Sequence, residues 1–419
     1  MRELIRSAHT RDVAAVFAVT ASVQGVVVVS QFLVAFAIKP EQLGLIRWLE
    51  SAFAIALLAT SCGMPSVAFR EAALRPSTAN RISLMARAAV LTSLAVTLVL
   101  LVAVAADFTV EQVSSAPGWA TLIVMTGALW PANVARVGVA IVQGGQLSKS
   151  VWGRLAAFSS VAIALLYLIT WMLGVKGWVV GRYIVEFGLA ALVVHALSHA
   201  GSKPEHSVAP GARDLRDLLW IGMTANFAFL IRAISDNLPI LLLRRSTLGA
   251  LEQLGWYGFA SLAIFMPTLI LSVVMQTRLP GLVQSVGDAP AFTRKLSDVQ
   301  GQLLRGAALG SGLIFVLSML VHWKLLFAAY APAAWPLSIL GASLPFRALI
   351  LTAGAAAVAH GRYAISSVLA ALEIVVVSVV SFSGHASNAT DMALVVFVAS
   401  ALSVLPALAL IRSLRRAPS

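Results

Sequence analysis

The stretch VAAVFAVTASVQGVVVVSQFLVAFAI, residues 13–38, contains no charged side chain. A helix that spans the hydrocarbon core of a bilayer needs about 20 mostly apolar residues. The core of a secretory signal peptide is shorter, about 7–15 residues. The stretch therefore predicts a transmembrane helix close to the N-terminus.

The composition extends this prediction to the whole chain. Apolar residues make up 59% of the 419 residues and charged residues only 11%, against roughly 25% charged in a typical soluble domain. A soluble surface needs more charge than this, so we expect a polytopic membrane protein. The net charge of +13 does not indicate a nucleic-acid partner, because the basic residues form no run or module that could grip a duplex.

Twelve apolar segments meet the length criterion, and they predict an all-α fold. We place them at residues 13–38, 43–69, 82–106, 117–143, 152–173, 177–199, 217–243, 254–278, 299–321, 333–359, 363–383 and 390–412. The connectors are short, so no extramembrane domain is expected. The single cysteine, Cys62, excludes a disulfide framework. The histidines form no metal-ligand cluster, and we expect neither a metal nor a cofactor.

The basic residues in the connectors predict the orientation. Eighteen Lys and Arg residues lie at one set of helix ends and five at the opposite set. Because cytoplasmic loops carry the excess of Lys and Arg, both termini are predicted to be cytoplasmic. The alternation also supports the even number of helices.

Two short motifs recur at nearly the same spacing. Glu41-Gln42-Leu43-Gly44 matches Glu252-Gln253-Leu254-Gly255, 211 positions later, and Gly127-Ala128-Leu129-Trp130-Pro131 matches Gly341-Ala342-Ser343-Leu344-Pro345, 214 positions later. Both matches join a helix to the sixth helix after it, which predicts two six-helix bundles related as parallel repeats. We therefore predict an N-terminal lobe at 1–200, a cytoplasmic linker at 201–216 and a C-terminal lobe at 217–419.

Several segments resemble motifs of bacterial polysaccharide flippases. Residues 36–45 (FAIKPEQLGL) are similar to the family's LGPEDFGLY turn, and residues 63–73 (GMPSVAFREAA) to its GLPTALVREAA segment. Residues 255–260 (GWYGFA) resemble VGLYSAA, residues 276–280 (QTRLP) resemble QVLLPRL, and residues 327–335 (FAAYAPAAW) resemble FGPEYAPAAW. The matches occur in order between about residues 30 and 365. The chain departs from the pattern at Lys39-Pro40-Glu41-Gln42, which lacks the glycine and the second acid.

The resemblance is to oligosaccharide flippases of the Wzx type, within the group that includes multidrug-and-toxin extruders and the lipid II flippase. It implies two bundles around a cavity that opens alternately to each side of the bacterial inner membrane. It also implies a cargo of undecaprenyl-pyrophosphate-linked oligosaccharide, used for O-antigen or other surface polysaccharide. The implied partners are this polyprenyl-pyrophosphate-linked glycan, membrane lipids, and a polysaccharide polymerase and glycosyltransferases.

Seven arginines lie in or at the edge of the predicted helices, where a charge costs at least ~2.5–3.5 kcal/mol. Arg47–Glu50, Arg182–Glu186 and Arg232–Asp236 are spaced to pair on their own helix faces, which gives them a purely structural explanation. Two others, Arg87 and Arg305, lie near cytoplasmic helix ends and can extend to the interface.

Arg136 and Arg347 have no acid within four positions, and each follows a proline, Pro131 or Pro345. Because guanidinium groups bind phosphate through bidentate bonds, we predict that these two arginines hold the cargo's pyrophosphate. The alternative is that one of them pairs with Glu373 or Asp236 across helices. The complete set of predicted substrate-binding residues is Arg136, Arg347, Arg232, Arg182, Gln24 and Asn226, with the last two as ligands of sugar hydroxyls.

Glu373 stands alone in an apolar segment and, with Asp236, is the candidate for proton or cation coupling. The alternative role for Glu373 is that of a cross-helix partner for an arginine. The chain shows no nucleophile–base–orienter set, so an enzyme such as a lipid-linked glycan polymerase or ligase is disfavoured. A small-molecule exporter of the multidrug type is the main alternative, although it would present carboxylates to cationic drugs.

Overall fold

A computed structural model describes residues 32–74, 85–99, 119–144, 149–199, 215–244, 250–360 and 362–416. The described chain consists of helices and turns. It divides into two compact units, each of which is described by itself. Unit one takes in the residues up to Val34 and Ala52–Phe227, and unit two takes in Ala35–Ser51 and Ala228–Ser419.

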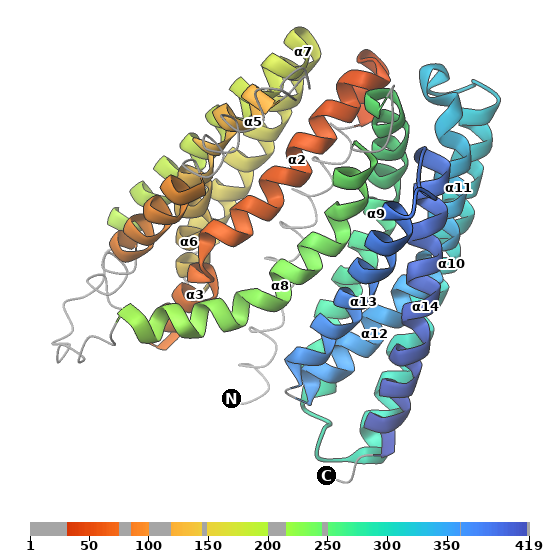
Figure 1. The fold of residues 1–419 in the computed structure, drawn as a ribbon. Coiled ribbons are helices and arrows are strands. Elements are labelled where there is room, and N and C mark those ends of the chain that lie inside the picture. The colour runs from red at the N-terminus through yellow and green to blue at the C-terminus, as the bar shows by residue number, and fades with distance from the viewer. Residues whose placement is uncertain are drawn as a thin grey trace, which may run out of the picture. The chain divides into compact units, whose positions relative to one another are not determined.

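The helices follow the predicted apolar segments closely (Figure 1). The first half of the chain contains α2 (Pro40–Ser61), α3 (Met64–Leu74), an apolar helix Met85–Val99, α5 (Trp119–Thr126), α6 (Leu129–Gly144) and α7 (Lys149–His199). The second half contains α8 (Leu215–Leu243), α9 (Ala250–Val283), α10 (Ala289–His322), the 3₁₀ turn η1 (Ala328–Ala333), α11 (Ala334–Ala342), α12 (Leu344–Ala359), α13 (Tyr363–Phe382) and α14 (Ala389–Arg416).

The helices have the length and apolarity of membrane spans, which confirms the predicted fold class. Within the described residues, seven helical stretches are long and apolar enough to cross a bilayer. They are Pro40–Ser61, Ile123–Val142, Gly153–Ser198, Leu251–Leu279, Ala289–His322, Ala328–Ala359 and Ala389–Leu414. Most of the predicted helix at 13–38 lies outside the described residues.

The 51-residue helix α7 is a hairpin rather than one straight rod. Gly174 has non-helical angles (φ 60°, ψ −139°) that only glycine adopts readily. A Cβ added at Gly181 would contact Leu166, and one added at Gly188 would contact Phe158. These contacts join residues on opposite sides of Gly174, so the two arms run antiparallel. They correspond to the two predicted spans 152–173 and 177–199.

The two Gly-Ala motifs of the sequence repeat both interrupt a helix. α5 ends and α6 begins at Gly127–Ala128, and α11 ends and α12 begins at Ser343. A hydroxyl group from a neighbouring helix satisfies a backbone carbonyl at each break. Tyr183 donates to the Val124 carbonyl, and Ser311 donates to the Gly341 carbonyl over 2.8 Å. The repeat therefore specifies a broken helix with exposed backbone groups, and each copy is completed by tertiary contacts.

The other repeated motif brings its two copies into contact with each other. A Cβ at Gly44 would overlap the Leu251 carbonyl oxygen, and a Cβ at Gly255 would overlap the Pro40 carbonyl oxygen. Pro40 and Leu251 are themselves 211 positions apart, as are Gly44 and Gly255. The contact is thus reciprocal, as at an interface with two-fold symmetry, and a local pseudo-two-fold axis passes between α2 and α9. Only glycine allows the two backbones to approach so closely.

Aromatic side chains surround the same part of unit two. Phe36 stacks on Phe327 with a centroid separation of 3.8 Å, and Phe259 stacks on Tyr330 at 4.8 Å. The Tyr330 hydroxyl donates to the Ile38 carbonyl over 3.1 Å. These contacts fasten residues 35–51 to α9 and η1. The lobe boundaries predicted from the sequence, 1–200 and 217–419, stay a prediction, because α2 contributes residues to both units.

Replacement of Gly44 by Ala is expected to destabilise the protein, because the added methyl group would overlap backbone atoms that cannot move independently. Overpacking of this kind typically costs about 1–3 kcal/mol. A Cβ added at Gly312 in α10 would have no atom within 4 Å, so Gly312→Ala is the matched control and should leave the stability unchanged or raise it. Thermal unfolding in detergent checks both, and equal melting temperatures for the two variants would contradict the close contact.

Candidate functional site

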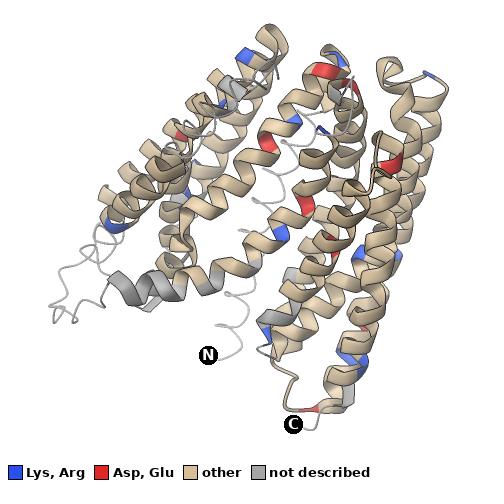
Figure 2. Cartoon of the chain, in the orientation of Figure 1, with Lys and Arg blue, Asp and Glu red and all other residues tan. Residues whose placement is uncertain are grey.

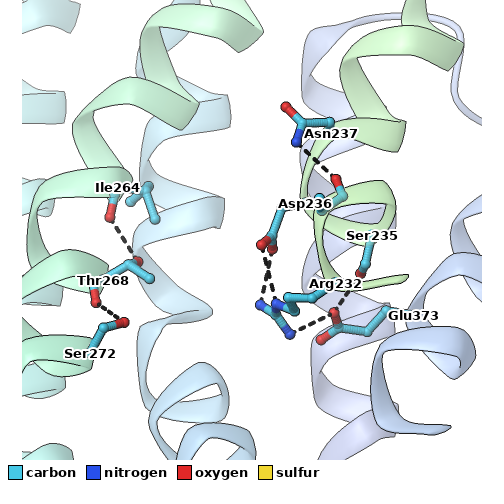
Figure 3. A network of polar contacts seen from close by, with 9 residues as sticks. Arg232, Ser235, Asp236, Asn237, Ile264, Thr268, Ser272 and Glu373 are labelled. Carbon is cyan, nitrogen blue, oxygen red and sulfur yellow. Dashed lines mark hydrogen bonds and ion pairs between the residues drawn. The ribbon is translucent and has the colours of Figure 1, made fainter. Parts of the chain in front are cut away.

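Charged side chains are sparse on the helices, and several lie part-way along them rather than at the ends (Figure 2). In unit two, Arg232 lies between two carboxylates (Figure 3). Its Nε and Nη2 atoms bond the two oxygens of Asp236 at 3.2 and 3.0 Å, and Nη1 lies 3.5 Å from Glu373 Oε2. The Ser235 hydroxyl donates to the same Glu373 oxygen over 2.8 Å. Helices α8 and α13 are thus joined by one guanidinium group.

A second ion pair in unit two comes from α2. Arg47 Nη1 lies 2.6 Å from Glu50 Oε2, and Arg47 Nη2 contacts the Ser261 hydroxyl of α9 at 3.5 Å. A Cβ at Gly258 would lie 2.9 Å from Arg47 Cγ. Because Gly258 has no side chain, the aliphatic part of the Arg47 side chain can lie against α9 at this point. Both charged side chains are less than a fifth exposed.

Arg347 of α12 is half-buried, and it forms no ion pair or side-chain hydrogen bond within the described part of the chain. Its Nε atom is buried without a hydrogen-bond partner. The charges of Arg347, Asp236 and Arg47 all act on Tyr257, a side chain that is only 4% exposed.

Unit one contains a different arrangement. Arg182 Nη2 lies 2.9 Å from Glu186 Oε1 within α7, and the Arg182 guanidinium also lies 4.7 Å from the Phe53 ring centroid. A cation over an aromatic face is attracted by the ring quadrupole. The Glu186 side chain is only 10% exposed, so this carboxylate depends on Arg182 for its counter-charge.

Arg136 of α6 lies within electrostatic range of Glu186 and Arg182. Its side chain is exposed, and among the described residues it forms no ion pair or hydrogen bond. The three groups Arg136, Arg182 and Glu186 sum to one positive charge. In the clusters of unit two, Arg47, Arg232 and Arg347 equal Glu50, Asp236 and Glu373 in number, so the corresponding sum is zero. The cluster in unit one thus has an uncompensated cation, which is suited to an anionic ligand.

The predicted sugar ligands have structural contacts or lie outside the description. The Asn226 amide donates to the Leu58 carbonyl of α2 over 2.8 Å. A comparable bond, from Asn133 of α6 to the Thr60 hydroxyl at 2.9 Å, leaves the Asn133 Oδ1 acceptor buried without a partner. Gln24 lies outside the described residues, so its predicted role is not tested.

The local pairings predicted from helical spacing are confirmed. Arg47–Glu50, Arg182–Glu186 and Arg232–Asp236 all form ion pairs. Glu373 is the cross-helix partner of an arginine, and that arginine is Arg232 rather than Arg136 or Arg347. Arg136 belongs to unit one and Arg347 to unit two, so their meeting across a shared cavity stays a prediction.

Sequence reasoning missed Ser235, Tyr257 and Phe53. Ser235 is three positions after Arg232 and shares its helix face, and this spacing was a usable signal. Tyr257 and Phe53 carried no such signal, because their charged neighbours come from other helices.

Comparison with solved structures identifies the fold. The chain matches an inward-facing multidrug resistance MATE family transporter of the MOP superfamily with a TM-score of 0.72 at 12% identity, over 95% of this chain and 96% of that one. It matches the lipid II flippase MurJ in an inward closed conformation with a TM-score of 0.72 at 13% identity, over 94% and 87%. An outward-facing MATE transporter matches with a TM-score of 0.58 at 12% identity, over 96% and 95%.

At these identities the likeness shows the fold alone. No protein-family model matches the chain, and no curated protein matches it. The fold is thus one that multidrug transporters and a lipid II flippase share, and the oligosaccharide-flippase resemblance goes further than these structures do.

Arg136 and Arg182 are expected to respond differently to neutralisation. Arg182→Gln leaves the buried Glu186 without its partner, which should cost about 1–3 kcal/mol of stability. Arg136→Gln breaks no described bond and should stay within ~0.5 kcal/mol of the wild type. Thermal unfolding compares the two variants, and Arg182→Gln combined with Glu186→Gln should recover part of the loss. A large loss for Arg136→Gln would show that this arginine has a structural partner.

Proposed function

We propose that this protein is a flippase that moves an undecaprenyl-pyrophosphate-linked oligosaccharide across a membrane by alternating access. The observation that carries the proposal is a pair of arginines, Arg136 and Arg347, that form no ion pair with any described residue and lie on two helices related by the internal repeat. Each helix begins after a break at the repeated Gly-Ala motif. The fold, which a lipid II flippase and multidrug transporters share, supports transport as the activity.

An arginine without a counter-ion is costly in an apolar helix, and such residues persist where they face a wet interior or a ligand. A pyrophosphate supplies the missing negative charge, and its oxygens match the planar guanidinium fork. On this proposal Arg136 and Arg182 bind phosphate in unit one and Arg347 binds it in unit two. Arg232, whose guanidinium is held by Asp236 and Glu373, assists Arg347 as a supporting group. Gln24 and Asn226 are the proposed ligands of the sugar hydroxyls.

The contact between Gly44 and Gly255 fits a cycle of alternating access. Residues 35–51 come from the first half of the repeat, yet they belong to unit two with α9 and η1. With both termini in the cytoplasm, as the basic residues predict, this contact lies at the outer side of the membrane. We propose that it separates when the transporter opens outward, and that Asp236 and Glu373 couple this change to an ion or proton.

The proposed cargo defines the setting. A bacterial inner membrane is where polyprenyl-pyrophosphate glycans are assembled and flipped, so we propose this location for the protein. Its partners would then be glycosyltransferases that supply the cargo and a polysaccharide polymerase that consumes it. The chemistry of the site is binding and release, and no covalent step is proposed.

The alternative is export of small cationic molecules, since a multidrug transporter matches the fold as well as the lipid II flippase does. Such cargo requires carboxylates that are free to receive a cation. In unit two, Asp236, Glu373 and Glu50 are each within ion-pair distance of an arginine. Arg136 and Arg347, by contrast, form no ion pair among the described residues, and this favours the anionic cargo.

Arg136→Gln and Arg347→Gln are each expected to lower flipping at least tenfold, because each removes a charge-assisted bond to phosphate worth about 1.5–3 kcal/mol. The measurement uses liposomes with reconstituted protein and a labelled polyprenyl-pyrophosphate glycan. Arg305→Gln is the matched control, since Arg305 is an arginine of α10 whose Nε donates to the Gly301 carbonyl.

The control should flip the lipid at the wild-type rate. Unchanged flipping by both the Arg136 and the Arg347 variants, at normal protein levels, would refute the pyrophosphate site. Failure of the wild-type protein to flip this lipid, combined with uptake of a cationic dye, would favour the multidrug alternative.

A further inference from the structure

Asp236 and Glu373 form a two-carboxylate site whose occupant is a cation of the chain itself. The carboxylates come from different helices, α8 and α13, and converge on one guanidinium group (Figure 3). All three nitrogens of Arg232 are engaged, two of them in a fork on Asp236. The arrangement resembles a binding site for a free guanidinium ion, except that the guanidinium here is a side-chain group of the protein itself.

A hydroxyl group next to Glu373 also belongs to the site. The Ser235 hydroxyl bonds Glu373 Oε2. Two carboxylates, with a hydroxyl that holds one of them in place, form a set of oxygen atoms that favours a cation.

The three charged side chains differ in the fraction of their surface that is exposed. The Glu373 side chain is 10% exposed, whereas Arg232 is 39% and Asp236 is 45% exposed. A small cation can therefore reach the site on the side of Asp236 while Glu373 forms its buried wall. The three groups sum to one negative charge.

We propose that Arg232 is the resident counter-cation of the Asp236–Glu373 site, so that the site needs no soluble metal ion. A variant without the guanidinium group would then hold a vacant anionic site. That site would bind free guanidinium-type cations best, because a planar fork matches carboxylate geometry bidentately, and alkali cations more weakly. For transport, which rests on the proposed function, coupling through Asp236 and Glu373 would then be to protons rather than to Na⁺ or K⁺.

The test is chemical rescue of Arg232→Ala in detergent solution. Thermal unfolding is measured with increasing millimolar methylguanidinium, and with tetramethylammonium as a cation that cannot donate hydrogen bonds. The melting temperature of Arg232→Ala is expected to rise saturably by on the order of 2 °C with methylguanidinium. The wild type should show no such rise, because its own guanidinium occupies the site.

Two further variants distinguish a site from a general salt effect. Arg232→Ala combined with Glu373→Gln removes half of the carboxylate charge and should lose the rescue. Arg232→Lys retains a cation and should respond to methylguanidinium less than Arg232→Ala. Equal responses from the wild type, Arg232→Ala and the double variant, or equal effects of the two cations, would overturn the proposal.

If Arg232→Ala alone does not fold, the proposal predicts which further substitutions restore folding. Neutralising both acids in the same chain, with Asp236→Asn and Glu373→Gln, should restore the yield because no uncompensated carboxylate is left. A triple variant that stays unfolded would contradict the proposal. None of these measurements uses cargo, so a failure of rescue is distinct from a failure of lipid flipping in liposomes.

Discussion

In the low dielectric of a helical membrane protein an unpaired charge is costly, and this cost organises the polar part of the molecule. A lone arginine at mid-bilayer costs at least ~2.5–3.5 kcal/mol. In unit two, Arg47, Arg232 and Arg347 are matched in number by Glu50, Asp236 and Glu373. The matching is local for two of the arginines, whereas the third lacks a direct partner among the described residues.

Unit one does not reach the same balance. Arg182 compensates Glu186 and leaves Arg136 with its charge uncancelled. The internal repeat therefore duplicates the broken helix and the arginine that follows a proline, but it does not duplicate the surrounding acids. This uncancelled charge is the feature on which the proposed anionic cargo depends.

The close approach of helix backbones to one another is the second feature that organises the structure. Gly44 and Gly255 let two copies of one motif meet at the backbone, and the helix breaks at Gly127 and Ser343 expose carbonyl groups that Tyr183 and Ser311 satisfy. In both cases a small residue of the repeat lets a neighbouring helix come close. The neighbouring group is a backbone carbonyl at Gly44 and Gly255, and a hydroxyl at the two helix breaks.

The sequence by itself determined the features that depend on local geometry. Apolar length specified the spans, and spacing of three or four residues specified pairs such as Arg182–Glu186, because one turn of helix places such residues side by side. The tertiary structure alone decided that Glu373 pairs with Arg232, that Arg182 lies over the Phe53 ring, and that Gly44 meets Gly255. Those partners come from helices far apart in the chain, and only the packing of helices, which no local pattern encodes, brings them within a few ångströms.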